Sequence, residues 1–234
     1  MVDKHSICKE RQPFGVFSCH AGGVDLTQPL STLSPSLEGD VLTVLAHTEA
    51  PLSGRQIATL ARRGSHTSVT SVLERLVDHG LAEVQRAGRA HLYRLNREHL
   101  LAPVVLQAVA ASGELRRRLG QALRGWAIPC LHASLYGSMP RGDSRADSDI
   151  DLLLIRPETL TESEMDSWDD QVRGLELDAF RWTGNTLSCM DLTVQDLARG
   201  LEANEPIFDS WREDGVLLIG SSLHSLLRGL PKAG

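Results

Sequence analysis

The pattern of apolar positions changes from one part of the chain to the next. From Leu37 onward, apolar residues recur at intervals of three and four, which predicts a first helix of about ten residues. A second short helix follows Ser53, a suitable N-cap, and a third runs from about Thr67 to His79 with an apolar stripe on one face. Gly80 is positioned to end that third helix.

Alternating apolar and polar positions follow this helical part. They predict two strands, at about 81–86 and 90–95, on either side of the turn at Ala87-Gly88. Three helices with a tight second turn, followed by a basic hairpin, are the parts of a winged helix-turn-helix. We therefore predict such a domain over residues 36–96.

The segments on either side of this domain carry weaker patterns. Residues 1–35 are rich in Gly, Pro, Ser and Thr without an apolar period, so we expect a disordered arm. The spacing of four potential metal ligands in this arm fits no zinc pattern: His5, Cys8, Cys19 and His20. Residues 97–127 are predicted to form a connecting helix, with Pro103 in its first turn and an amphipathic pattern beyond it.

The second half of the chain contains the segment with the clearest chemical pattern, ASLYGSMPRGDSRADSDIDLLLI at 133–155. A predicted strand ends before Gly137, and Asp149 and Asp151 lead into a second, very apolar strand. Side chains two residues apart on a strand share a face, so these two carboxylates should repel each other unless a cation lies between them. Oxygen ligands favour Mg²⁺ or Mn²⁺. Gly137 allows close approach of a phosphate, and Ser138 offers a hydroxyl and an amide donor.

Composition and charge narrow the class of protein. Hydrophobic residues make up 41% and charged residues 23%, which is typical of a soluble globular protein. No signal peptide or membrane-spanning stretch is visible, so we expect a cytoplasmic protein with no membrane partner. Residues 36–127 carry twelve arginines against eight acids, whereas residues 128–234 carry nine basic residues against nineteen acids. This asymmetry indicates two domains with different partners, a polyanion for one and metal ions for the other. The cysteines form no C-x-x-C pair and are too dilute for a disulfide scaffold: Cys8, Cys19, Cys130 and Cys189.

The order of elements over residues 36–96, with LVDHGLAEVQRAGRAHLYRL at the end, resembles the winged-helix domains of bacterial transcriptional regulators. In that family the third helix enters the major groove and the wing contacts the backbone or the minor groove. The resemblance implies contacts to double-stranded DNA from Ser65, His66, Thr67, Ser68, Thr70, Ser71, Arg86, Arg89 and Arg94. The third helix departs from the pattern because it carries Arg75 but also Glu74 and Asp78. A module that docks a protein or forms a homodimer is therefore the alternative.

The pattern GSMPRGDSRADSDIDLLL resembles the signature of the DNA polymerase beta nucleotidyltransferase superfamily, in particular its minimal members in toxin–antitoxin and standalone proteins. Asp147 also falls at a position that matches this signature. The resemblance implies that nucleotide is bound by Gly137, Ser138, Arg141 and Ser148, with Arg141 and Ser148 falling at matching spacer positions. It also implies a third catalytic and metal-binding carboxylate beside Asp149 and Asp151. We assign it to Asp191, inside a strand predicted at 187–193, rather than to Asp178 in a helical pattern.

These readings predict an α+β protein with a winged helix-turn-helix followed by a small nucleotidyltransferase domain at 128–234, in which helices flank a mixed sheet. By resemblance, the activity is metal-dependent transfer of a nucleoside monophosphate from a nucleoside triphosphate, with ATP expected, to a hydroxyl on protein or RNA. One alternative is a DNA-binding regulator that senses a nucleotide without turnover. The other is an antitoxin that modifies or covers a partner toxin.

Overall fold

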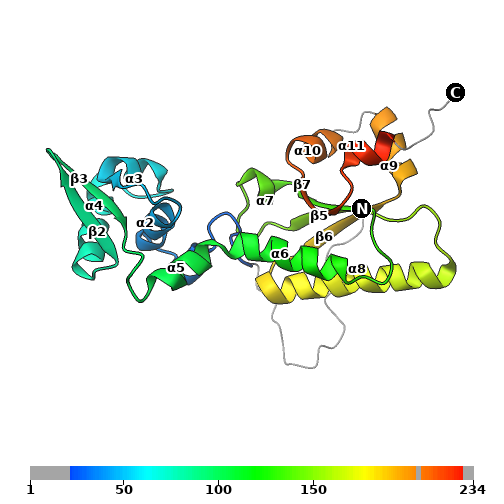
Figure 1. The fold of residues 1–234 in the computed structure, drawn as a ribbon, viewed down its shortest axis with the longest axis horizontal. Helices are drawn as coiled ribbons and strands as arrows, with labels where there is room; N and C mark the ends of the chain where they lie inside the picture. Colours follow the sequence, from blue (N-terminus) through cyan, green and yellow to red (C-terminus); the bar gives the residue numbers. More distant parts are fainter. Residues whose placement is uncertain (1–21, 204–206, 229–234) are drawn as a thin grey trace.

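The computed structural model describes residues 22–203 and 207–228 and has mixed α and β structure, as predicted. Two lobes with separate hydrophobic cores lie side by side and are joined by two successive helices (Figure 1). We call residues 30–109 the N-terminal lobe and residues 111–228 the C-terminal lobe. Among the described residues, no helix is both long and apolar enough to cross a membrane.

The N-terminal lobe consists of short helices packed against a three-stranded antiparallel sheet in the order β1-β3-β2. Its elements are α1 (Leu30–Leu33), α2 (Leu37–Ala46), β1 (Leu52–Ser53), α3 (Gly54–Leu60), α4 (His66–Asp78), β2 (Ala82–Ala87), β3 (Ala90–Leu95) and α5 (Ala102–Val109). The three predicted helices and the predicted hairpin are confirmed at nearly the expected positions.

Local capping accounts for the sharp helix boundaries in this lobe. Ser53 and Gln56 form a reciprocal capping box at the start of α3, and Ser65 and Ser68 form one at the start of α4. Gly80 has a φ of +75°, in the left-handed region where a residue without Cβ is favoured. The chain therefore leaves α4 where the sequence predicts, and β2 follows directly.

The C-terminal lobe is built on a four-stranded mixed sheet in the order β6-β5-β4-β7. Strand β4 is antiparallel to β5 and β7, whereas β5 and β6 are parallel. Its elements are α6 (Ala111–Arg124), β4 (His132–Tyr136), α7 (Ser138–Arg141), β5 (Ile150–Ile155), α8 (Glu162–Thr183), β6 (Leu187–Leu192), α9 (Val194–Glu202), α10 (Ile207–Glu213), β7 (Val216–Gly220) and α11 (Leu223–Arg228).

Helices cover this sheet on both faces (Figure 1). On one face, Leu135, Leu152 and Leu154 pack with Trp168 of α8 and with apolar residues of α6. On the other face, Leu153 and Ile155 pack with apolar residues of α9 and α10. We call these the α8 face and the α9 face. The alternation of side chains along each strand assigns every sheet residue to one of them.

Two features differ from the sequence-based expectations. The connecting segment forms two helices instead of one, with a break at Ala110, whose ψ of 0° departs from helical geometry. Part of the arm expected to be disordered over 1–35 is ordered, because residues 22–35 make specific contacts and include α1. Leu26 is buried in the core of the C-terminal lobe and Leu30 in that of the N-terminal lobe. Residues 1–21, with His5, Cys8, Cys19 and His20, lie outside the described residues.

Candidate functional site

The candidate site lies where the turn after β4 passes over the start of β5. Gly137 has a φ of +79°, and a Cβ at this position would collide with Oδ2 of Asp151. Tyr136 is aligned with Asp151 across the β4–β5 pair. Only glycine therefore allows the backbone of this turn to rest directly against the carboxylate.

Asp149 and Asp151 lie close enough for their charges to interact, but only Asp151 is on β5, and Asp149 directly precedes the strand. Burial is the largest cause that raises the pKa of Asp151, and the negative charge of Asp149 raises it further. The described residues provide no hydrogen bond to the Asp151 carboxylate, which is half-buried, while Asp149 is exposed. The pair is a concentration of negative charge that the chain itself compensates only in part.

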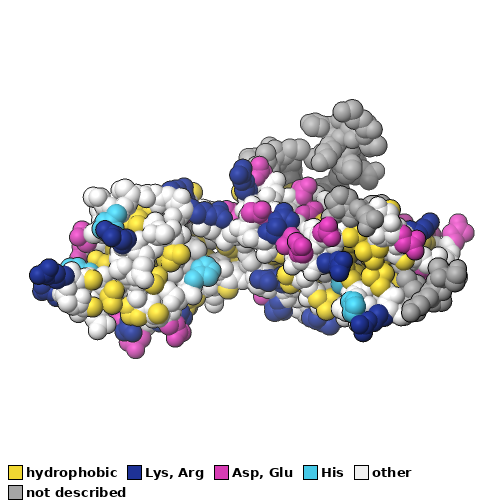
Figure 2. All heavy atoms as spheres, turned by 90° about the horizontal axis from the view of Figure 1, so that it is seen from above, with side chains coloured by type: hydrophobic (Ala, Val, Ile, Leu, Met, Phe, Trp, Pro, Cys, Tyr) yellow, Lys and Arg dark blue, Asp and Glu magenta, His cyan; other side chains and the backbone are white. Residues whose placement is uncertain are grey.

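Arg141 supplies the partial compensation. Its positive charge lowers the pKa of Asp151, although burial and Asp149 have the larger effects. The guanidinium forms ion pairs with Asp143 at 3.5 Å and with Asp214, just after α10, at 3.2 Å. The exposed acidic and basic side chains on this side of the C-terminal lobe lie close together in Figure 2. Sequence reasoning missed Asp214, whose only signal was the polar turn before the last strand.

Asp191 does not join this cluster, and its placement corrects the prediction. The parallel register aligns Asp151 with Ser188 and Leu154 with Asp191. Asp191 therefore lies about 10 Å further along its strand and, by alternation, on the α8 face. Its Oδ2 accepts a hydrogen bond from Nε1 of Trp168 at 3.0 Å and lies 3.5 Å from Nε of Arg156.

The position beside Asp151 on β6 is occupied by Ser188 instead of a carboxylate. Within the described ranges, no group of three His, Cys, Asp or Glu side chains is arranged to hold a metal ion. The strand pairing was predictable from the sequence, but a one-residue difference in register moves a side chain to the opposite face of the sheet.

The remaining predicted nucleotide ligands have different surroundings. Ser138 is half-buried, and its carbonyl accepts the backbone N–H of Asp143. The hydroxyl of Ser148 instead accepts the N–H of Arg145 at 2.9 Å, so it closes a turn within the 142–149 loop. Its backbone carbonyl accepts a hydrogen bond from the side chain of Asn185. The structure therefore places Ser148 as a loop-forming residue.

The predicted DNA-contacting residues lie on two elements of the N-terminal lobe. Ser65, His66, Thr67 and Ser71 are exposed at the start of α4, although Ser65 and the half-buried Ser68 also bond each other in the capping box. Thr70 is half-buried and its hydroxyl bonds to the carbonyl of His66.

The hairpin arginines differ in their partners. Arg94 pairs with Glu83 across β2 and β3, whereas Arg86 and Arg89 form no ion pair with any described residue. Basic side chains are prominent at the outer end of the N-terminal lobe (Figure 2), where Figure 1 places the hairpin tip. The strongest uncompensated positive charge of the hairpin is therefore at its tip.

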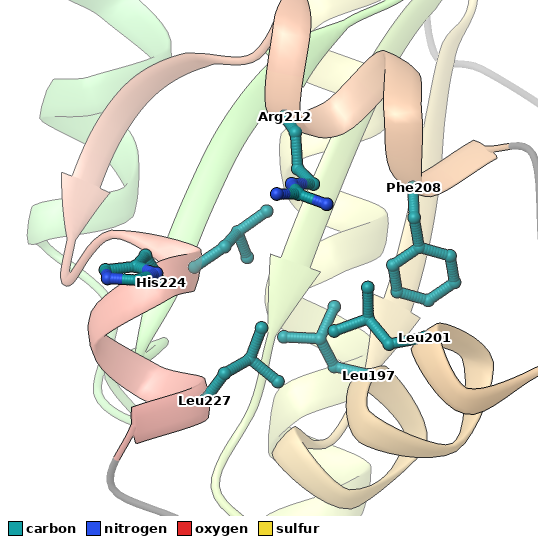
Figure 3. Close-up of a pocket in the computed structure, with 7 residues that line it drawn as sticks. Leu197, Leu201, Phe208, Arg212, His224 and Leu227 are labelled. Atoms are coloured by element: carbon teal, nitrogen blue, oxygen red, sulfur yellow. The ribbon is translucent and has the colours of Figure 1, made fainter. Parts of the chain in front are cut away.

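A separate apolar cavity of about 240 Å³ opens on the α9 face. Figure 3 shows Arg212 and His224 near it from α10 and α11, with apolar side chains between them. The residues that line it are Leu197, Leu201, Phe208, Arg212, Leu223, His224 and Leu227. This lining suits an apolar group better than a triphosphate.

No protein-family model matches the chain, and no curated protein matches it in sequence. A solved structure to which the chain is similar is a crystal structure of a toxin-antitoxin with AMP-PNP. The sequence identity is 14%, the TM-score is 0.30, and the match covers 48% of this chain and 81% of that chain. A TM-score this low does not identify a shared fold, so the assignment of the site rests on the geometry described above.

Proposed function

We propose that the C-terminal lobe is a metal-dependent nucleotidyltransferase that takes a nucleoside triphosphate as its donor. The observation that carries this proposal is the half-buried Asp151 carboxylate, which lies beside Asp149 and directly against the backbone of Gly137, because the described residues compensate the charge of this pair only in part. Asp151 is half-buried and accepts no hydrogen bond from the described residues, so a bound cation would offset the free-energy cost of keeping it ionised.

The residues present fit one Mg²⁺ ion that is shared with a nucleotide. Mg²⁺ in phosphate-transfer sites is commonly held by one or two carboxylates together with phosphate oxygens, so Asp149 and Asp151 suffice as protein ligands. When bound, such an ion supplies Lewis-acid stabilisation of charge on the phosphates. Burial, and then repulsion by Asp149, raises the pKa of Asp151, and a bound cation would offset both effects.

The chain's own residues would mainly bind and orient. Asp149 and Asp151 would hold a metal ion that also binds the phosphates, and glycine at position 137 lets the backbone of the turn rest against the Asp151 carboxylate. Arg141 is exposed and can exchange its contact with Asp214 for a phosphate oxygen. Transfer of the nucleoside monophosphate to a hydroxyl of protein or RNA then needs positioning and charge stabilisation, without a protein nucleophile.

The experiment is incubation with labelled nucleoside triphosphates, Mg²⁺ and cell extract, followed by detection of label on protein or RNA. Asp151→Ala should abolish the transfer. Asp191→Ala and Asp178→Ala are matched aspartate controls that should retain it, because Asp191 lies on the α8 face and Asp178 pairs with Arg181 on α8. Equal labelling by wild type and Asp151→Ala would contradict the proposal.

A second candidate function is nucleotide sensing without turnover. The observation that favours it is the position of Asp191, which leaves Ser188 where a third carboxylate would complete a two-metal arrangement. A sensor would bind ATP with Mg²⁺ in calorimetry and transfer no label to any acceptor. Binding together with transfer would exclude this candidate.

We propose that the N-terminal lobe is a winged helix that binds double-stranded DNA. The exposed start of α4 supports entry into the major groove, and the unpaired Arg86 and Arg89 support contact with phosphates. Glu74 and Asp78 are also exposed on α4, so phosphate contacts should dominate affinity. Absence of duplex binding at low salt would favour a protein-docking role instead.

A further inference from the structure

The segment at residues 22–29, which we call the strap, is seated on the C-terminal lobe by close backbone contacts. The N–H of Gly23 donates to the carbonyl of Ala146 at 2.7 Å, and the N–H of Val24 donates to the carbonyl of Thr183 at 2.9 Å. A Cβ at Gly23 would lie 2.5 Å from the side chain of Asn185 and 2.7 Å from its backbone nitrogen. The strap therefore fits this seat only with glycine at position 23.

Asn185 connects the strap to the loop that leads into the carboxylate pair. Its side chain is buried, and Oδ1 accepts the N–H of Val24 at 3.0 Å. Its Nδ2 donates to the carbonyls of Ala146 and Ser148 at 3.3 and 3.1 Å. Ser148 directly precedes Asp149, so one buried amide holds both the strap and the backbone next to the site.

The strap adds a further bond to the same loop. The hydroxyl of Thr27 donates to the carbonyl of Ser144, which is buried. The strap thus contacts the segment 144–148 at its first residue and, through Gly23, at Ala146 in its middle, while Asn185 holds the last residue, Ser148. The loop has little other cover, because Arg145, Ala146 and Asp147 are exposed.

The other end of the strap is anchored in the N-terminal lobe. Asp25 accepts the N–H groups of Thr27 and Gln28 and also pairs with Arg62 at 3.2 Å, in the turn between α3 and α4. Leu26 is buried in one core and Leu30 in the other. A short segment thus bridges the two lobes.

We propose that the strap positions the 142–149 loop, and through it Asp149, and that Asp25 links this positioning to the N-terminal lobe. The expected effect on nucleotide affinity rests on the proposed function. The positioning of the loop by the strap does not. A loop held on both sides keeps Asp149 beside Asp151, whereas a released strap leaves Asn185 with one fewer partner and the loop free to open.

The test compares Gly23→Ala with Gly22→Ala in the full chain. A Cβ at Gly22 meets nothing within 4 Å, so this variant controls for the added methyl group. Hydrogen exchange of the peptide covering 143–149, measured without nucleotide, should become about tenfold faster in Gly23→Ala and stay unchanged in Gly22→Ala. Equal exchange in the two variants at equal Tm would overturn the positioning role.

A second variant tests the link to the other lobe. Asp25→Asn keeps an oxygen for the N–H groups of Thr27 and Gln28 but removes the charge that pairs with Arg62. We expect a smaller increase in exchange of the same loop, and exchange equal to wild type would overturn the link. Gly23→Ala should also weaken Mg²⁺-dependent ATP binding by about fivefold or more, with Gly22→Ala unaffected. If wild type binds no nucleotide, the proposed function fails while the exchange measurement still decides the role of the strap.

Discussion

Two aspartates on neighbouring strands of one sheet have opposite surroundings. Asp151 on β5 lies on the α9 face beneath Gly137, and no described residue donates a hydrogen bond to its carboxylate. Asp191 on β6 lies on the α8 face, where Trp168 donates a hydrogen bond and Arg156 provides a positive charge. Burial raises the pKa of both; the hydrogen bond from Trp168 and the charge of Arg156 oppose this effect at Asp191, whereas only the charge of Arg141 opposes it at Asp151.

Asp191 therefore has a hydrogen-bond donor and a positive charge beside it, whereas Asp151 accepts no hydrogen bond from the described residues. A partnered aspartate contributes to stability through its bonds. A half-buried aspartate that accepts no hydrogen bond from the described residues is unfavourable for stability, which is why we propose a ligand for Asp151. The arginines of the hairpin differ in the same way: Arg94 pairs with Glu83, whereas Arg89 forms no ion pair with a described residue.

The largest effect is expected for nucleotide binding. Even residues around metal ligands change affinity by about 10- to 100-fold, so loss of a ligand in Asp151→Asn should weaken Mg²⁺-dependent ATP binding by at least about 100-fold. Calorimetric titration measures this effect. Asp147→Asn, in the exposed loop that precedes β5, is the control and should bind as wild type does. Unchanged ATP affinity in Asp151→Asn would contradict the proposed role of Asp151 in nucleotide binding.

A smaller effect, on stability, is expected for Asp191→Ala. The variant leaves Nε1 of the fully buried Trp168 without its acceptor, which should cost about 1–2 kcal/mol in the free energy of unfolding. Urea denaturation measures the change, and ATP binding should remain intact. Asp191→Asn can still accept the bond and should recover part of the loss. If Asp191→Ala were as stable as wild type but no longer bound ATP, nucleotide binding would belong to the α8 face instead of the α9 face.

In the absence of metal, replacing Asp151 should have the opposite effect on the free energy of unfolding from replacing Asp191. Because its pKa is raised on folding, the folded protein holds this proton more tightly than the unfolded chain, and its ionisation at neutral pH opposes folding. Asp151→Asn should therefore increase stability by up to about 1 kcal/mol at about pH 7. The gain should shrink as pH falls through the raised pKa, which thermal unfolding over a pH series can follow.

Mg²⁺ or Mn²⁺ should stabilise the wild type through the same group. A ligand present at about 100 times its Kd adds about 2.7 kcal/mol to the free energy of unfolding, and metal without nucleotide should add less. Asp149→Asn should reduce the shift in Tm. An identical shift in wild type and Asp149→Asn would assign the metal effect to another place.

The smallest effect is expected at the hairpin. Arg89→Ala removes an unpaired charge and should weaken duplex DNA binding a few-fold across sequences, lowering the salt slope by about 1. Arg94→Ala removes a charge already paired with Glu83 and should have a smaller effect. Fluorescence anisotropy over a salt series compares the two variants. Equal losses would indicate that pairing within the hairpin does not govern DNA contact.

The sequence allowed prediction of the elements because their signals are local. Apolar periodicity and capping residues such as Ser53 and Gly80 act within one or two turns of the chain, and the structure has these boundaries. The approach of Gly137 to Asp151 was not predicted, because thirteen residues, including α7, separate β4 from β5 and the strand pairing brings the two residues together. The order at residues 22–35 was not predicted either, because its contacts reach partners as distant in sequence as Asn185.

The sequence by itself determined that two carboxylates lie two residues apart at the start of an apolar strand, because this spacing is independent of the rest of the fold. Only the tertiary structure decided which face Asp191 occupies, because this depends on the register of β6 against β5. It also decided that Arg94 pairs with Glu83 and that Asp191 accepts a hydrogen bond from Trp168, whereas within the described part of the chain Arg89 forms no ion pair and Asp151 accepts no hydrogen bond. Such pairing depends on distances between side chains that are remote along the chain, and local patterns do not encode those distances.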